Sequence, residues 1–373
     1  MNEGAGRETG LLTEVLRDVS RAFYLTMRVL PEGTRQPVSV AYLLARAADT
    51  IADTQAVAAA DRLRLLLAFR HMVAETTTGE ALGDLSAALS AQKSGFSPID
   101  AGEARLLTRL PDLFAIYETL PDGDRARVRD VVVTLTTGME RDLETFPAEG
   151  SGDVGALADA DALERYTWEV AGCVGDFWTR VTAAHTGALR HWDVTRTSEI
   201  GQAFGKGLQL VNVLRDLPRD LRNGRCYLPT DELAEVGLAP TDLLHVGATH
   251  ALRPVLRRWT ARARALLGDA QAYVLAIPRH CTRLRLAALW PVLIGLATLQ
   301  RLEAADAWLD GTRRVKVSRG WIYRMIALSL PASFSNTALR AWFQALGGVS
   351  SDSTSSSAAQ ASSRSRSDSR NLL

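Results

Sequence analysis

The sequence predicts an all-α protein. Apolar residues recur at helical spacing in almost every segment, and the alternating pattern of a strand is scarce. Residues that form turns interrupt this spacing at "LPEGTRQP", "LPDGD", "FPAEGSGD" and "NGRCYLPTDE". We therefore expect a series of packed helices joined by short connections.

Ten helices are expected along the chain. They span residues 11–30, 37–54, 58–75, 104–118, 124–145, 161–185, 196–221, 254–276, 282–309 and 317–330. "LPEGTRQP" separates the first two, "LPDGD" precedes the fifth, "FPAEGSGD" precedes the sixth, and "NGRCYLPTDE" follows the seventh. The ninth holds the most apolar run, Leu286 to Leu299, which Pro291 should bend. At fourteen residues this run is too short to cross a bilayer, so we expect no transmembrane helix.

Composition indicates one large domain followed by a tail. The chain has 373 residues, of which 47% are hydrophobic, and no linker-like change in composition divides residues 1–349. From Val349 onward the sequence is rich in serine and nearly free of large apolar groups, so burial cannot offset the entropy lost on ordering. We expect one helical domain over residues 1–349 and a disordered tail over residues 350–373.

Charge and cysteine usage exclude several classes of function. Forty-three basic residues against 42 acidic ones leave no bulk field that would attract nucleic acid or an acidic membrane surface, so any anion site must be built locally. Cys173, Cys226 and Cys281 are too few and too widely spaced for a disulfide framework or a zinc site. The six histidines form no HExxH pair. The N-terminal residues contain acids and no long apolar core, which argues against a signal peptide. We expect a cytoplasmic protein that does not bind nucleic acid.

The stretch "ARAADTIADT" places two aspartates on an otherwise apolar helix. Tyr42, Arg46, Asp49 and Asp53 are spaced i, i+4, i+7 and i+11, so they form one narrow stripe. Like charges at i, i+4 repel, and a divalent cation would offset that repulsion. The alternative is an ion pair on a solvated helix face. Because the remaining residues of this helix are apolar, we expect the stripe to line a cavity.

A second segment, "GKGLQLVNVLRDLPRD", repeats this pattern. Its polar stripe consists of Gln209, Asn212, Asp216 and Asp220, at i, i+3, i+7 and i+11. Pro218 lies within the segment and should kink it, which would free the carbonyl of Leu214. Arg222 and Arg225 follow directly. A third pair, Asp306 and Asp310, does not lie in a comparable apolar segment, and we interpret it as a solvated surface pair.

Two carboxylate stripes with arginines nearby suit the binding of a diphosphate through Mg²⁺. Mg²⁺ prefers oxygen ligands and is usually held by one or two carboxylates together with substrate phosphates. The chemistry that this arrangement serves is ionisation, in which a diphosphate leaves and an allylic cation remains. Such a cation survives only in a dry pocket, and an apolar helical core is a natural wall for one.

Four motifs in order along the chain support this interpretation. "SRAFYLTMRVLP" resembles an S-R-x-F-Y opening, and "YLLARAADTIAD" resembles the pattern Y-x-x-x-R-x-x-D-x-x-x-D. "YTWEVAGCVG" resembles Y-x-x-x-V-A-G-x-V-G, and "QLVNVLRDLPRDLRNGRCYLP" resembles Q-x-x-N-I-x-R-D-x-x-x-D followed by G-R-x-[FY]-x-P. Over about Ser20 to Arg319 the chain thus resembles the squalene/phytoene synthase family, the head-to-head trans-isoprenyl diphosphate synthases.

The resemblance implies a fold and a set of roles. The fold would be an isoprenoid-synthase-type helical bundle around a central apolar cavity. Asp49, Asp53, Asp216 and Asp220 would carry Mg²⁺, and Tyr166 occupies the position of a tyrosine implicated in the first half-reaction. The residues expected to bind diphosphate are Ser20, Arg21, Tyr42, Arg46, Asn212, Arg215 and Arg225. Gly172 and Gly175 would allow the close approach of either a helix or a substrate chain.

Within this family the sequence is most similar to the squalene-forming members. "PVLIGLATL" resembles their P-x-V-M-A-I-A-T-L stretch, and "VKVSRG" resembles their V-K-I-R-K-G segment. By this resemblance Lys316 and Arg319 would meet the phosphates of NADPH, and the reaction would join two farnesyl diphosphates through presqualene diphosphate. The alternative for these two residues is a basic, solvated helix start. Peripheral association with a membrane, for release of the product, is a further expectation.

Two other functions stay open. The chain could form phytoene, dehydrosqualene or hydroxysqualene without hydride transfer. It could also be a non-catalytic assembly factor of the same fold, although such a protein should have lost aspartates that this chain retains.

Overall fold

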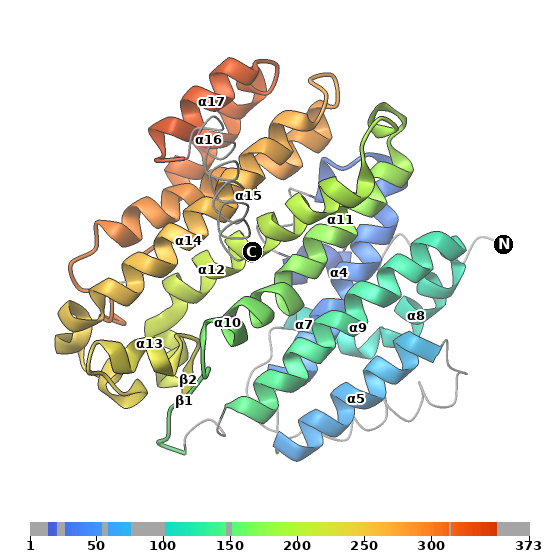
Figure 1. Ribbon diagram of the computed structural model, residues 1–373. Coiled ribbons are helices and arrows are strands. Elements are labelled where there is room, and N and C mark those ends of the chain that lie inside the picture. Colours follow the sequence, from blue (N-terminus) through green and yellow to red (C-terminus); the bar gives the residue numbers. More distant parts are fainter. Residues whose placement is uncertain are drawn as a thin grey trace, which may run out of the picture.

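The computed structural model describes residues 14–20, 27–53, 59–75, 101–146, 151–312 and 315–348. These residues are mostly helical, as predicted, with one pair of two-residue strands (Figure 1). The α-helices are α2 (Leu16–Ser20), α4 (Glu32–Asp53), α5 (Ala59–Glu75), α7 (Ala101–Thr108), α8 (Leu110–Thr119), α9 (Asp122–Thr145), α10 (Ala160–Thr167), α11 (Cys173–His185), α12 (Val194–Arg222), α13 (Thr230–Glu235), α14 (Thr249–Ala276), α15 (Thr282–Glu303), α16 (Arg319–Ala332) and α17 (Asn336–Ala345). The short helices are η3 (Trp168–Gly172), η4 (Gly187–Leu189), η5 (Pro240–Leu244) and η6 (Val246–Ala248), and the strands are β1 (Gly155–Ala156) and β2 (Arg225–Cys226).

Several predicted boundaries are wrong where a proline was misinterpreted. Helix α4 begins at Glu32 rather than at residue 37, because the carbonyl of Pro31 accepts the first helical hydrogen bonds, from the amides of Thr34 and Arg35. Pro37 lies in the second turn of this helix, where its missing N–H removes only one bond. The helix predicted over residues 104–118 is two helices, because Pro111 begins a new one.

Other differences concern helix ends. The helix predicted over residues 282–309 stops at Glu303, and the short α13 and the ten-residue α17 were not predicted. The helix predicted over residues 161–185 is interrupted by the π-helical turn η3. Part of the predicted first helix and the whole predicted tail lie outside the described residues.

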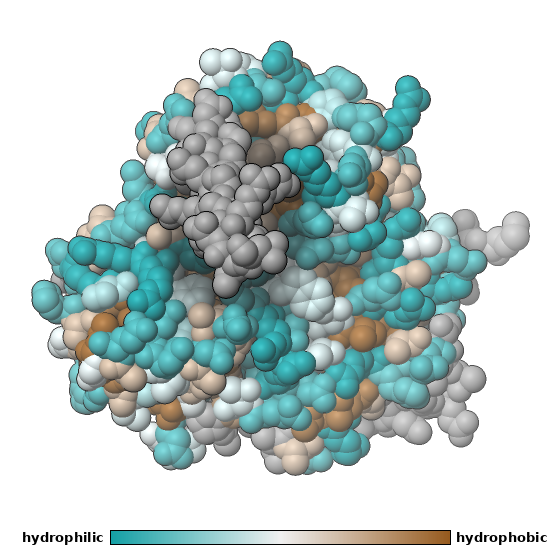
Figure 2. Space-filling model, viewed as in Figure 1, coloured by the Kyte–Doolittle hydropathy of each residue, from teal (hydrophilic) through white to brown (hydrophobic). Residues whose placement is uncertain are grey.

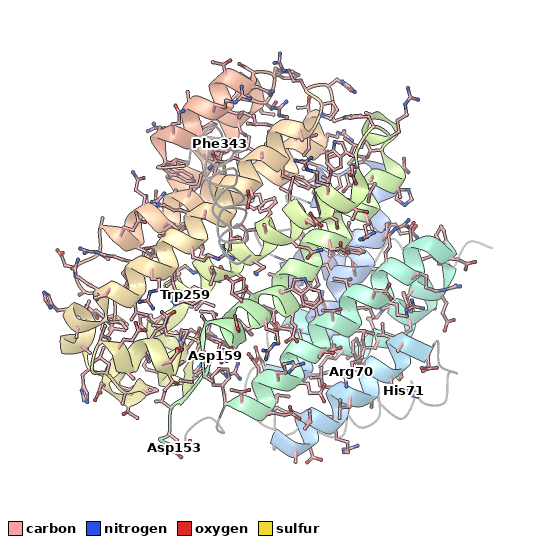
Figure 3. The ribbon with its side chains drawn as sticks, in the orientation of Figure 1. Arg70, His71, Asp153, Asp159, Trp259 and Phe343 are labelled. Carbon is pink, nitrogen blue, oxygen red and sulfur yellow. The ribbon has the colours of Figure 1, made fainter. Side chains whose placement is uncertain are left out.

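The bundle contains two hydrophobic cores that meet at its centre. One is built mainly from α4, α5, α8 and α9, and the other from α12, α14, α15 and α17. On α5, Arg70 bonds to Thr137 and Glu140 of α9 and His71 faces outward, while Trp259 and Phe343 belong to the second core (Figure 3). Helix α11 contributes Phe177 to the first core, and α12 packs closely against both α11 and α14. The central helices α11 and α12 therefore join the two halves.

The close packing of α12 against η3 and α11 depends on glycine. A Cβ atom at Gly175 would lie 1.8 Å from the carbonyl oxygen of Gly201, and one at Gly205 would lie 2.1 Å from that of Ala171. No side chain fits in these positions, so the two backbones touch. Gly175 therefore serves helix packing, one of the two roles considered for it.

Helix α15 meets the length and apolarity criteria for a membrane span, with 22 residues. The prediction that its apolar run is too short considered only part of the helix. However, 78% of the apolar window is buried within the protein, against α12, α14 and α16. Burial, rather than length, identifies α15 as a core helix. The visible face of the molecule is largely hydrophilic, with small scattered apolar patches (Figure 2).

The two strands hold one loop in place beside the end of α12. They pair in parallel, Gly155 with Arg225 and Ala156 with Cys226. Helix α12 ends in a turn at Gly224, whose φ of 78° is in the left-handed region that favours glycine. This turn and the strand pairing fix the direction in which Arg225 and Tyr227 leave the helix.

Candidate active site

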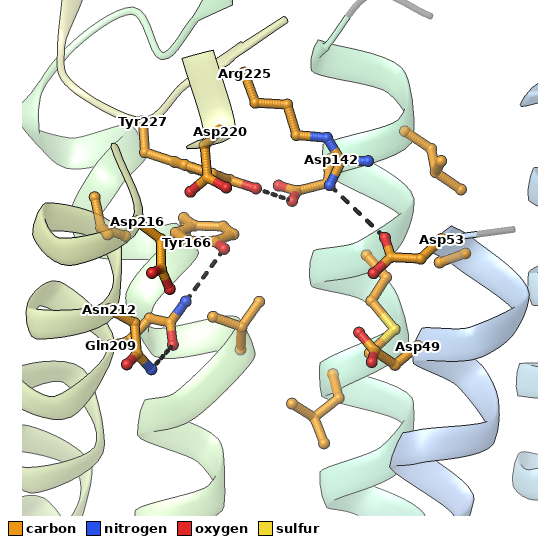
Figure 4. Close-up of a pocket in the computed structure, with 16 residues that line it drawn as sticks. Asp49, Asp53, Asp142, Tyr166, Gln209, Asn212, Asp216, Asp220, Arg225 and Tyr227 are labelled. Atoms are coloured by element: carbon orange, nitrogen blue, oxygen red, sulfur yellow. Dashed lines mark hydrogen bonds and ion pairs between the residues drawn. The ribbon is translucent and has the colours of Figure 1, made fainter. Parts of the chain in front are cut away.

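A polar cavity of about 320 Å³ lies between α4, α9 and α12 (Figure 4). Its lining includes five aspartates, Asp49, Asp53, Asp142, Asp216 and Asp220, and one arginine, Arg225. Each acid-bearing helix ends at the cavity: α4 at Asp53, α9 three residues after Asp142, and α12 two residues after Asp220. A helix C-terminus carries partial negative charge. Three converging C-termini and five carboxylates therefore create a site for cations.

One wall of this cavity is the last turn and a half of α4. Asp49 and Asp53 project from it toward α12 (Figure 4). Arg46 forms ion pairs with both Asp49 and Glu103, and is not among the residues that line the cavity. Helix α4 has no basic residue in its last turn. This wall therefore keeps much of its negative charge.

The opposite wall is the end of α12. Gln209, Asn212, Asp216 and Asp220 all line the cavity, so the structure brings both predicted stripes to one space. Arg215 Nε lies 3.0 Å from the Oδ1 atom of its neighbour Asp216. Arg225 Nη1 lies 3.8 Å from Asp53 Oδ1 and thus connects this wall to the first.

A hydrogen-bonded network closes one end of the cavity. Tyr227 donates a hydrogen bond of 2.6 Å to Asp142, and its ring stacks on Tyr166 with centroids 4.5 Å apart. Gln209 Nε2 donates to the Tyr166 hydroxyl at 3.2 Å, and Asn212 Nδ2 donates to Gln209 Oε1 at 3.3 Å (Figure 4). The Tyr166 hydroxyl is thereby held at the boundary of the site.

Sequence reasoning missed Asp142 and Tyr227. Asp142 has no partner acid at i, i+4, and Glu140 and Glu144 on the same helix offer equally plausible candidates. Tyr227 lies within the motif "GRCYLP", and this motif was the only feature of the sequence that could have indicated it as a site residue. The π-helical turn η3, directly after Tyr166, was also missed. The small residues of "AGCVG" were its only indication, and π-turns often accompany functional sites.

Burial raises the pKa of three of the aspartates. It raises the pKa of Asp142 to about 7, against a hydrogen bond from Tyr227 that lowers it. Burial and then the nearby Asp216 raise the pKa of Asp220 to about 7. Burial and then Asp53 raise the pKa of Asp49 to about 6. The Asp49 side chain is 39% exposed, but it faces a cavity surrounded by protein rather than open solvent. The carboxylates repel one another, and bound cations would relieve that repulsion.

The kink expected from Pro218 has a specific partner. If residue 218 were not proline, its amide would donate a hydrogen bond to the carbonyl of Leu214. That carbonyl instead accepts a hydrogen bond of 2.8 Å from the indole of Trp308. Trp308 is buried against α12 just beyond the end of α15. The aspartate-bearing end of α12 is therefore fixed from behind. Asp306, of the third aspartate pair, is fully exposed, in agreement with the surface pair predicted for it.

An apolar cavity of about 490 Å³ adjoins the polar one. Leu135, Val170, Gln209 and Asn212 line both cavities, so the two spaces share a boundary. The apolar cavity runs between α4, α11, α12 and α15, and its lining includes Tyr42, Phe177, Phe204, Gly205, Ala288 and Pro291. Tyr42, predicted to lie near diphosphate, instead faces this apolar space and donates a hydrogen bond of 3.2 Å to the carbonyl of Val19.

The polar cavity fits Mg²⁺ bound together with a substrate. Among the residues that the structure describes, no group of three acidic, histidine or cysteine side chains is close enough to hold a metal ion by itself. The aspartates are spread over facing walls. This arrangement suits Mg²⁺, which binds one or two carboxylates and completes its shell with water and phosphate oxygens. The ions would therefore be held by Asp49 and Asp53 on one side and by Asp216 and Asp220 on the other.

Two of the remaining predicted residues lie away from both cavities. Lys316 and Arg319 are exposed on and before α16, and neither lines either cavity. Lys316 accepts a hydrogen bond from Arg301 at its carbonyl oxygen. Ser20 is the last residue of α2, and Arg21 lies outside the described residues.

Similarity to known proteins agrees with this geometry. The model of the squalene/phytoene synthase family matches residues 16–321. Phytoene synthase 1 of Zea mays is 27% identical over 335 residues, which cover 87% of this chain and 68% of that protein. Phytoene synthase of an Oncidium hybrid cultivar is 30% identical over 65% of this chain and 56% of its own length. Squalene synthase BSS of Botryococcus braunii is 27% identical over 57% of this chain, and the chain spans only 41% of BSS.

A solved structure shows the same fold. The complex of TcSQS with the ligand E5700 superposes with a TM-score of 0.71 and covers 91% of each chain. Sequence identity with it is 19%, so this likeness concerns the all-helical architecture.

Proposed function

The chain belongs to the squalene/phytoene synthase family of prenyltransferases, which join prenyl diphosphates head to head, and we propose that it makes squalene from two farnesyl diphosphates. The observation that carries the proposal is the shared boundary of the two cavities. A prenyl diphosphate has a highly charged head and an apolar chain. The polar cavity suits the diphosphate head and the apolar cavity suits the prenyl chain. The bond that joins the head to the chain would therefore lie near Val170, Gln209 and Asn212.

The side chains around this boundary have distinct tasks. Mg²⁺, when bound to the aspartates, neutralises the diphosphate and makes it a better leaving group. Arg225 points into the same cavity and adds a permanent positive charge for the phosphate oxygens. Burial and then Asp142 raise the pKa of Tyr166, so its hydroxyl stays neutral beside the reacting carbons. A neutral hydroxyl can donate or accept a hydrogen bond, whereas a phenolate would repel the diphosphate.

The walls of the apolar cavity protect a carbocation. Gly175, Gly201 and Gly205 bring two helix backbones together along one side of it. Phe177 and Phe204 add aromatic surface. Water that reached the cation would convert it to an alcohol, and this lining leaves few polar groups to hold water there.

Reduction by NADPH is the step that distinguishes squalene from the alternatives. The similarity of "PVLIGLATL" and "VKVSRG" to the reductive members supports it. Pro291, at the start of the first of these segments, lines the apolar cavity. The cofactor would supply the hydride that quenches the final cation. Lys316 and Arg319 do not face the cavities, so they would reach only the outer phosphates of such a cofactor.

Phytoene formation is the second candidate. It is favoured by the names of the relatives, which are mostly phytoene synthases. That reaction joins two longer prenyl diphosphates and uses no hydride. The two candidates share the aspartates and the first half-reaction, and they differ in chain length and in the need for NADPH.

A product assay separates the two candidates. The protein is incubated with Mg²⁺ and either farnesyl or geranylgeranyl diphosphate, with and without NADPH, and the extracts are examined by mass spectrometry. We expect squalene from farnesyl diphosphate only when NADPH is present, and presqualene diphosphate or its alcohols without it. Phytoene from geranylgeranyl diphosphate, unchanged by NADPH, would overturn the squalene assignment.

A further inference from the structure

The C-terminal helical hairpin carries an unusual charge. Residues 315–348 contain four basic residues, Lys316, Arg319, Arg324 and Arg340, and no acidic residue. The whole chain has a net charge of only +1, so the remainder carries a net charge of −3. All four basic side chains are exposed. The hairpin is therefore a localised positive surface on a protein that is otherwise slightly negative.

The same hairpin exposes large apolar side chains. Tyr323 and Leu330 of α16 are 69% and 50% exposed, and Phe334, in the turn after the helix, is 58% exposed. Tyr323, Ala327 and Leu330 are spaced i, i+4 and i+7 and so share one face of α16, and Phe334 follows in the turn after the helix ends at Ala332. We call these four residues the α16 stripe. Of the eight large apolar residues exposed in the described part of the chain, four lie on or directly after α16, with Leu328 the fourth.

The opposite face of α16 is fixed to the bundle. Met325 and Ser329 are buried, and Trp290 of α15 donates a hydrogen bond of 2.9 Å to the Ser329 hydroxyl. Trp290 precedes Pro291, which lines the apolar cavity. Helix α16 therefore lies on the outside of α15, the helix that forms one wall of that cavity. Its outward face is held rigidly toward solvent.

Neither the tail nor a second copy suits this surface. Residues 349–373 contain only three large apolar residues, Val349, Leu372 and Leu373, so they cannot cover the α16 stripe. A second copy of the chain would bring two positive hairpins together. An apolar stripe beside arginines matches a different occupant, the surface of an anionic bilayer. There, aromatic and aliphatic groups enter the acyl region and arginines meet lipid phosphates.

We propose that α16 docks the protein on anionic lipid membranes. Tyr323, Leu330 and Phe334 enter the edge of the acyl region, and Arg324 binds lipid phosphates beside them. The family match ends at residue 321, so nearly all of this surface lies beyond it. Docking would place the outside of the α15 wall against the bilayer. If the proposed function holds, this is where an apolar hydrocarbon product leaves water, although docking itself does not depend on the identity of the product.

Vesicle flotation with the full chain tests the proposal. The vesicles contain either phosphatidylcholine alone or phosphatidylcholine with about one third phosphatidylglycerol. We expect the parent protein to float with the anionic vesicles at least tenfold more than with the neutral ones. High salt should reduce binding, because exposed charges are screened. The variant Tyr323→Gln/Leu330→Gln/Phe334→Gln should lose about tenfold, and Arg324→Glu should lose at least about fivefold.

Matched controls separate the stripe from general surface effects. Leu244→Gln/Val246→Gln removes two other exposed apolar side chains, 46% and 48% exposed, and should bind like the parent. None of the substituted residues lines either cavity, so turnover of prenyl diphosphate in detergent should stay within twofold. Failure of the parent to bind anionic vesicles, or equal binding by the stripe variant, would overturn the proposal. A dimer in light scattering that the stripe variant dissociates would also overturn it, in favour of a second copy of the chain.

Discussion

The two walls of the polar cavity carry similar aspartate pairs in different electrostatic settings. On α4, the pair stands at the end of a helix whose last turn has no basic residue. On α12, the last turn contains Arg219 and Arg222, and Arg215 contacts Asp216 directly. Arg46, the arginine within the α4 stripe, also binds Glu103 and so compensates the aspartates less fully.

This difference suggests a division of labour. Both walls end in a helix C-terminus, which favours cations. The α4 wall has little positive charge of its own, so it depends on bound Mg²⁺ to neutralise its carboxylates. Beside the α12 wall, Arg225 lines the cavity and presents positive charge to it, so Arg225 can hold phosphate oxygens directly. Substitutions on the two walls should therefore be distinguishable.

The largest effect is expected from removing a carboxylate from either wall. Asp49→Asn and Asp216→Asn should each lower turnover by about 10³-fold, because each removes a charge that binds the cation stabilising the leaving diphosphate. The measurement is turnover of farnesyl diphosphate over a range of Mg²⁺ concentrations, with circular dichroism to show that the fold is retained. If the two walls differ as described, added Mg²⁺ should restore less activity to the Asp49 variant. A variant with activity near that of the parent would show that its wall does not bind catalytic metal.

A smaller effect is expected at the tyrosine between the walls. Tyr227→Phe keeps the ring that stacks on Tyr166 but removes the hydrogen bond to Asp142. Since that bond lowers the pKa of Asp142, its loss should raise the pKa above about 7. We expect turnover at pH 7 to fall about tenfold, as for a lost bond to a charged group, and to recover partly at higher pH. A uniform loss at every pH would indicate a purely structural role for Tyr227.

Stability should depend on pH and Mg²⁺ together. The folded-state pKa values of Asp49, Asp142 and Asp220 are raised, so the folded protein binds more protons than the unfolded chain between about pH 4 and 7. The metal-free protein should therefore lose stability as pH rises through this window. Mg²⁺ should raise the melting temperature more at pH 8 than at pH 5. Asp49→Asn should remove the part of this dependence near pH 6, and Asp220→Asn the part near pH 7. An unchanged pH profile in both variants would contradict this assignment.

The smallest effect concerns the support behind α12. Trp308→Phe leaves the carbonyl of Leu214 unpaired, which should cost about 1–3 kcal/mol of unfolding free energy. Because Leu214 lies two residues before Asp216 and six before Asp220, the apparent affinity for Mg²⁺ should also fall a few-fold. Trp259→Phe is the matched control, since it removes a 3.0 Å bond to Glu232 far from the cavity. It should lower stability and leave Mg²⁺ affinity unchanged. Equal Mg²⁺ affinities in the two variants would rule out a positioning role for Trp308.

Local sequence patterns predicted the parts of the site that lie on one helix face. Asp49 with Asp53, and Asp216 with Asp220, follow from helical spacing alone, as does the carbonyl freed by Pro218. Residues that join different elements could not be predicted in this way. Asp142 has no second acid four residues away on α9, and Glu103 reaches Arg46 from 57 residues away. Only tertiary packing selects these two from other acids nearby in the sequence.

The helix boundaries show a similar limit. The sequence alone does not distinguish a proline in the first turns of a helix from a proline that ends a helix. The two differ only in the hydrogen bonds around them. At Pro31 and Pro37 the chain continues into α4, because the lost hydrogen bond is in the first turns. The fold class could be predicted because it depends on the periodicity of many residues rather than on any single one.

The most direct test of a metal site shared by both walls is a count of bound cations. Mn²⁺ replaces Mg²⁺ as a paramagnetic probe, and its binding is measured with and without an unreactive thio-analogue of farnesyl diphosphate. We predict that the analogue raises the number of tightly bound Mn²⁺ ions to more than one per chain. Asp49→Asn and Asp216→Asn should each lower that number. An equal count with and without the analogue, or an unchanged count in both variants, would contradict the shared site.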